Sequence, residues 1–92
     1  MSDFIFSVNP EAAASIHNEG IVILHTGKGT LYSSNHTGAR IWRAVERHLS
    51  LEAIAKEISD AYQIAVTVAR DHVVRFVEEL ERHMLIQREP AQ

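Results

Sequence analysis

The chain has no cysteine among its 92 residues. Disulfide bonds, thiolate metal sites and cysteine nucleophiles are therefore excluded, and the composition suits a reducing compartment. The longest apolar run, residues 21–24, is far too short to cross a bilayer, and the first residues lack the basic segment and apolar stretch of a signal peptide. We expect a cytoplasmic protein with no membrane segment.

Positive charge is also in short supply. The formal net charge is −3 with neutral histidines, which argues against binding to nucleic acid through phosphate contacts. Hydrophobic residues make up 46% and charged residues 23%, an ordinary balance for a globular protein. The length predicts a single domain over residues 1–88, followed by a flexible tail at residues 89–92.

The first third of the chain favours β-strands, and the remainder favours helices. The expected strands are Phe4–Val8, 13–17, 21–25 and Thr30–Ser34. Two glycines in residues 26–29 predict the turn of a hairpin. Apolar residues then recur at helical spacing in three segments, and the predicted N-caps of these helices are Asn35, Ser50 and Thr67.

This order predicts an α+β domain of winged-helix-like shape, with a short antiparallel three-stranded sheet followed by three helices. Three strands cannot close into a barrel, so the sheet must have a free edge. The segment Thr30–Ser34 has neither proline nor charge, the usual protections of an edge strand. We expect this strand to accept a further strand.

No residue pattern indicates an enzyme, a metal site or a cofactor. None of the six histidines forms an i, i+4 pair, so they are interpreted as surface residues. The segment Gly27-Lys28-Gly29-Thr30 lacks the spaced glycine of a phosphate-binding loop and opens a strand. The helix carboxylates show no pairing that would separate their pKa values for acid–base chemistry.

Residues 35–42, Asn-His-Thr-Gly-Ala-Arg-Ile-Trp, resemble the N-x-T-G-A-x-I-W segment of the PqqD-like family. This family of small proteins includes pyrroloquinoline quinone biosynthesis protein D. Residues 50–55 resemble its T-x-E-E-I-A helix start, and the resemblance extends over roughly residues 4–86. Ser34 replaces a usual leucine, while His48 and Met84 replace glycines near helix ends. The departures at His48 and Met84 predict different helix ends. Together the departures favour a distant subfamily over authentic quinone biosynthesis, which stays one option among several.

The resemblance implies a RiPP recognition element, a non-catalytic domain that binds the leader of a ribosomally synthesised precursor peptide. In that family the leader adds as a strand to the third strand of the sheet, beside the third helix. It is then presented to a modifying enzyme such as a radical SAM enzyme, or to a leader protease. With the groove placed in this way, the predicted peptide-binding residues are Thr30, Leu31, Tyr32, Ser33, Ala69, His72, Val73, Arg75 and Phe76.

Two other functions are compatible with the residues. A winged-helix domain can bind nucleic acid, here through Arg40, Arg43 and Arg47 of the first predicted helix. Alternatively, the unprotected strand could pair with its own copy in a small structural subunit. We expect a monomer or a weak homodimer, with the leader peptide and its modifying enzyme as partners.

Overall fold

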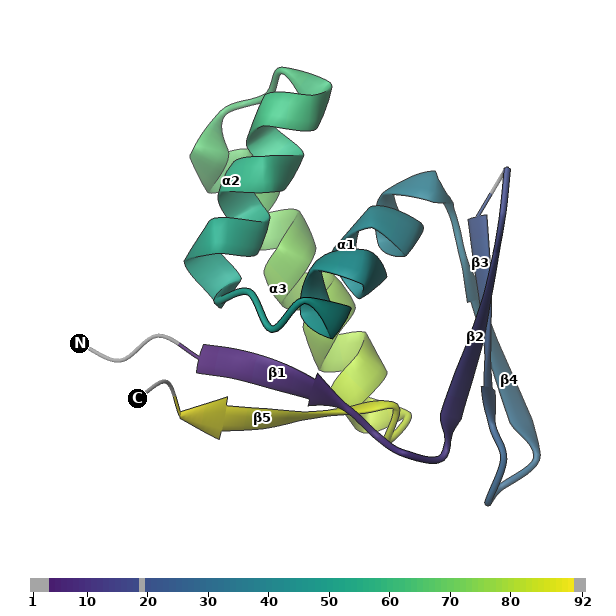
Figure 1. The fold of residues 1–92 in the computed structure, drawn as a ribbon. Coiled ribbons are helices and arrows are strands. Elements are labelled where there is room, and N and C mark those ends of the chain that lie inside the picture. Colours follow the sequence, from purple (N-terminus) through teal and green to yellow (C-terminus); the bar gives the residue numbers. More distant parts are fainter. Residues whose placement is uncertain (1–3, 19, 91–92) are drawn as a thin grey trace.

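A three-stranded antiparallel sheet forms one side of the molecule, and three helices lie on the other side of it (Figure 1). The structure is a computed structural model and describes residues 4–18 and 20–90. The sheet has the order β2 (Ala12–His17), β3 (Gly20–His25) and β4 (Thr30–Ser34). The turn at residues 26–29 joins β3 to β4, which confirms the predicted hairpin and the predicted α+β class.

A second, two-stranded sheet joins the two ends of the described chain. Strand β1 (Phe4–Val8) pairs with β5 (Ile86–Pro90) in antiparallel register. The sequence did not predict β5, because its letters Ile-Gln-Arg-Glu-Pro carry a weak strand signal. The prediction of a loose tail from residue 89 is therefore wrong for residues 89 and 90, which β1 holds in the ladder. Residues 91 and 92 lie outside the described residues.

Two of the three predicted helix caps are confirmed. Helix α1 (His36–Glu46) is capped by Asn35, and α2 (Leu51–Tyr62) by Ser50. Helix α3 (Val66–Arg82) begins after Ala65 without a side-chain cap, so the prediction for Thr67 is wrong. Thr67 already lies inside the first helical turn, where it cannot act as a cap.

The core lies between the helices and the inner face of the sheet. Residues from every layer are 2% exposed or less; they include Phe6, Ile23, Trp42, Ile58, Val77 and Leu85. Residues 85 and 86 also pack against the body, since Leu85 is 1% and Ile86 is 4% exposed. No helix within the described residues is long and apolar enough to span a membrane.

The helix ends at His48 and Met84 keep the backbone shape that glycine favours. His48 has φ 59° and Met84 has φ 60°, both in the left-handed region. After each residue the next amide donates to the carbonyl five positions back, from Leu49 to Ala44 and from Leu85 to Leu80. This is the Schellman pattern, so the expectation of different helix ends is wrong. The left-handed backbone conformation is kept at both residues, at a steric cost because neither residue is glycine.

Candidate peptide-binding groove

Strand β4 is an outer strand of its sheet, and no described residue pairs with its far side. The Thr26 amide donates to the Glu11 carbonyl at 2.8 Å, so these opposite residues form a hydrogen-bonded pair. Hydrogen bonding alternates along and across antiparallel strands. The backbone groups of Tyr32 therefore point to β3, whereas those of Leu31 and Ser33 point to the free edge. These two residues offer the N–H and C=O groups that an added strand needs.

The side chain of Tyr32 lies between β4 and α3. Its ring centroid is 6.2 Å from that of Phe76 and 5.0 Å from that of His83. Both separations are within the range of favourable ring contacts. Phe76 lies on α3 and His83 is the C-cap residue of this helix, seven positions later. Tyr32 therefore contacts α3 both along its length and at its C-terminal end. A groove thus runs between the free edge of β4 and this helix.

Tyr32 and the nearby Glu79 both have shifted pKa values. Partial burial and the carboxylate of Glu79 raise the pKa of the Tyr32 hydroxyl above its ordinary value, so the phenol stays protonated at neutral pH. A hydrogen bond from Arg82 at 2.7 Å, aided by His83, lowers the pKa of Glu79. The groove therefore contains a neutral hydroxyl and a firmly ionised carboxylate.

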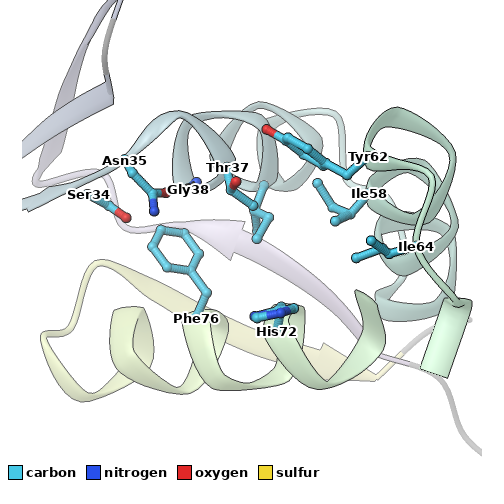
Figure 2. A pocket seen from close by; sticks show the side chains of 10 residues that line it. Ser34, Asn35, Thr37, Gly38, Ile58, Tyr62, Ile64, His72 and Phe76 are labelled. Carbon is cyan, nitrogen blue, oxygen red and sulfur yellow. Dashed lines mark hydrogen bonds between the residues drawn. The ribbon is translucent and has the colours of Figure 1, made fainter. Parts of the chain in front are cut away.

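A cavity of about 330 Å³ lies at the Ser34 end of β4. Figure 2 shows His72 and Phe76 projecting from α3 toward α1, with Tyr62 and Ile64 closing the side nearer α2. The lining residues are Ser34, Asn35, Thr37, Gly38, Ile41, Ile58, Tyr62, Ile64, His72 and Phe76. The mixture of apolar walls and a few polar groups suits one bulky side chain of a peptide.

The predicted site residues divide between the surface and the core. Thr30, Leu31 and Ser33 are exposed on β4, and Leu31 is 70% exposed. His72 and Phe76 line the cavity. Arg75 is exposed and forms an ion pair at 3.1 Å with Asp71, four positions before it on α3.

Ala69 and Val73 cannot contact a peptide in this conformation, because both side chains are 0% exposed. The prediction for these two residues is therefore corrected: the stripe that they form on α3 faces the core. Helical spacing alone does not distinguish the buried residues of this stripe from the residues at its border, which can line a groove. Sequence reasoning also missed the contribution of α2, whose Ile58 and Tyr62 line the cavity.

Within the described residues, no three His, Asp or Glu side chains gather closely enough to hold a metal ion. Among the polar residues that the structure describes, only His25 is buried, at 4% exposure, so the interpretation of the six histidines as surface residues is wrong for this one. Its Nδ1 accepts a hydrogen bond from the Lys28 amide at 3.1 Å. This histidine thereby fixes the turn between β3 and β4.

The arrangement defines a winged-helix-like α+β domain with an open strand edge beside a helix. Two solved structures share this fold. One, TbiB1 in complex with the TbiA(beta) leader peptide, is 21% identical, with a TM-score of 0.82 over 88% of this chain and 94% of that chain. The other, lasso peptide synthetase B1 complexed with the leader peptide, is 22% identical, with a TM-score of 0.81 over 89% and 96%.

The sequence profile of the family described as Coenzyme PQQ synthesis protein D (PqqD) matches residues 20–86. The chain belongs to this family. No curated protein matches it significantly. The family match begins at β3, so β1 and β2 lie outside the matched segment.

Proposed function

We propose that this protein is a non-catalytic chaperone for a peptide: it binds the leader of a ribosomally synthesised precursor and presents it to a modifying enzyme. The observation that carries the proposal is the free edge of β4 beside α3, with a cavity at one end. Family membership and two solved relatives named as leader-peptide complexes support it.

Strand addition explains how such a site can hold an extended peptide. Backbone groups of Leu31 and Ser33 would bond to the leader and provide affinity that depends little on its sequence. Leader side chains that point inward would meet Tyr32 and Phe76, and one at the Ser34 end would enter the cavity. The selective residues are therefore on α3 and around the cavity.

The proposed peptide-binding set is Thr30, Leu31, Tyr32, Ser33, His72, Arg75 and Phe76. Arg75 extends from an exposed position and would exchange its pair with Asp71 for an acidic leader residue. Because surface ion pairs contribute little, this exchange would tune selectivity more than affinity. The receiving enzyme would be a radical SAM enzyme or a leader protease.

Nuclear magnetic resonance provides the direct test. The leader peptide encoded next to this gene would be titrated into ¹⁵N-labelled protein, with a scrambled leader as control. We expect the largest amide shifts at Leu31, Ser33 and the α3 residues from His72 to His83. Saturable binding that leaves these amides unmoved would refute the proposed site, and no binding by any neighbouring leader would refute the function.

A further inference from the structure

The three-stranded sheet has a second outer strand, β2, at the edge opposite β4. The alternation that exposes Leu31 and Ser33 on β4 also applies here. On β2 the backbone of Ser15 is hydrogen-bonded to β3. The backbone groups of its neighbours Ala14 and Ile16 therefore point away from the sheet. Strand β2 has no proline, lysine or acidic residue to protect this edge.

Helix α1 faces β2 across a groove. Two adjoining hollows, of about 430 Å³ and 720 Å³, lie between the strand and the helix. Both are lined by Ile16, Arg43 and Arg47, so they form one continuous depression. Its strand side includes the aliphatic Ala14 and Ile16. Its helix side carries three arginines, which outnumber the two carboxylates of the lining, Glu46 and Glu57. We call this depression the β2–α1 groove.

The charge of the β2–α1 groove is opposite to that of the whole protein. Arg40, Arg43 and Arg47 are three of only nine lysines and arginines in a chain of net charge −3. Glu57 binds Arg47 through both carboxylate oxygens, at 2.8 and 2.7 Å. Arg40 lies 5.7 Å from the centre of the Tyr62 ring, and neither Arg40 nor Arg43 forms an ion pair with a described residue. Two guanidinium groups are therefore available to a carboxylate.

We propose that the β2–α1 groove docks an extended acidic segment of a protein partner, which adds to the edge of β2. The backbone of Ala14 and Ile16 would pair with the segment. Because alternate side chains of a strand share one face, carboxylates on the inward face would meet Arg40 and Arg43 beside the aliphatic side chain of Ile16. A polypeptide fits better than nucleic acid, since strand edges pair with peptide groups and three arginines are a small basic surface for a duplex.

This site and the proposed leader groove lie at opposite edges of one sheet, and Arg40, which lies over the ring of Tyr62 in the leader cavity, is placed between them. A partner on β2 leaves the edge of β4 open, so a leader and a second protein can be held at the same time. The inference does not depend on the leader function. It would stand as a protein-docking surface even if β4 bound no leader.

Trp42 provides a local reporter for the test. It is the only tryptophan in the chain and lines the hollow beside Ala14. Its side chain is 1% exposed, and its indole Nε1 has no hydrogen-bond acceptor among the described residues. Emission from Trp42 should therefore respond to a peptide on β2, whereas binding at β4 should leave it nearly unchanged.

The experiment uses a short synthetic peptide of alternating glutamate and valine, titrated into the ¹⁵N-labelled full chain at low salt. We expect shifts at Ala14, Ile16 and the exposed face of α1, together with a change in Trp42 emission. The double substitution Arg40→Glu and Arg43→Glu should weaken this binding by about tenfold or more. The control Lys56→Glu reverses one charge, where the double variant reverses two, on an exposed part of α2, and it should leave the binding unaffected.

Other outcomes would overturn the inference. An alternating lysine and valine peptide that bound equally well would remove the role of charge. Shifts confined to β4 and α3, or no shifts at millimolar peptide, would remove the site. Tighter binding of a short DNA duplex to the same amides would assign the groove to nucleic acid. Because leader binding is measured on β4, its failure and the failure of this docking site remain distinguishable.

Discussion

The two edges of the three-stranded sheet have the same backbone geometry and different neighbours. Strand β4 faces α3, where Tyr32 contacts Phe76 and a cavity adjoins the strand. Strand β2 faces α1, where arginines border an aliphatic strand. The backbone of an edge strand accepts almost any extended peptide, so the facing helix must decide which one binds. One small sheet can therefore offer two sites of different specificity.

The contrast arises from how each helix packs. On α3 the core stripe of Ala69 and Val73 leaves Phe76 half-buried at its border, directly beside Tyr32. On α1 the buried side includes Ile41 and Trp42, and the arginines occupy the other side. Aromatic contact is consequently available at the β4 edge, and a row of arginines beside aliphatic side chains at the β2 edge.

The largest effect that we predict is the loss of leader affinity when a proline is placed at the β4 edge and not at the β2 edge. Ser33→Pro removes an outward N–H from β4 and should weaken binding of the encoded leader by at least about 30-fold, the equivalent of about 2 kcal/mol. Ala14→Pro makes the same change on β2 and should leave leader affinity unchanged. Isothermal titration calorimetry would measure the leader affinity of both variants. Each variant should keep its sheet, because a proline at an outward-facing edge position leaves the hydrogen bonds to β3 in place.

Circular dichroism would establish that both proline variants are folded, and Leu31→Pro offers a second outward position on β4 if Ser33→Pro is not. Equal losses of leader affinity in the β2 and β4 variants would show that the leader does not discriminate between the edges. The comparison between the two grooves would then fail.

A smaller effect is expected at Gly38, which touches only the leader groove. A Cβ atom at this position would collide with the Ser34 side chain and lie 3.0 Å from Phe76 Cζ. Overpacking of this kind costs about 1–3 kcal/mol, and the better helix propensity of alanine returns up to about 1 kcal/mol. Gly38→Ala should therefore lower the free energy of unfolding by about 1–2 kcal/mol, measured by urea denaturation.

The same substitution should weaken binding of the leader, because Ser34 and Phe76 line the cavity. It should leave binding of the glutamate–valine peptide to β2 unchanged. Unchanged stability in Gly38→Ala would mean that Ser34 and Phe76 move aside freely. The cavity would then be too soft to select a side chain.

Much of the fold could be predicted because its local signals agree. The strands Phe4–Val8 and Thr30–Ser34, the hairpin turn and the caps Asn35 and Ser50 each follow from short stretches of sequence. Strand β5 could not be predicted in this way, because it exists through pairing with β1 across nearly the whole chain. Its own residues carry little strand propensity.

The candidate site was predictable only in outline. Periodicity correctly places an apolar stripe on α3, but it cannot tell Val73, which is fully buried, from Phe76, which lies at the border. That distinction depends on the distance and tilt between α3 and the sheet. The left-handed backbone at His48 and Met84 was missed although the family resemblance places glycine at both positions, because the residue types present argue against it.

The smallest predicted effect tests the two helices that build the grooves. His48→Gly, at the end of α1, and Met84→Gly, at the end of α3, relieve a left-handed cost of about 1–2 kcal/mol and add a chain-entropy cost of about 0.5–1 kcal/mol. Each should raise the free energy of unfolding by about 0.5–1 kcal/mol in thermal or urea unfolding. Met84→Gly should gain less stability, because it loses the contact of 2.9 Å between Lys28 Nζ and Met84 Sδ.

Neither variant should change leader or glutamate–valine peptide affinity, since both residues lie outside the residues proposed to contact either peptide. A loss of stability at His48→Gly would show that its side chain, and not its backbone, holds the end of α1.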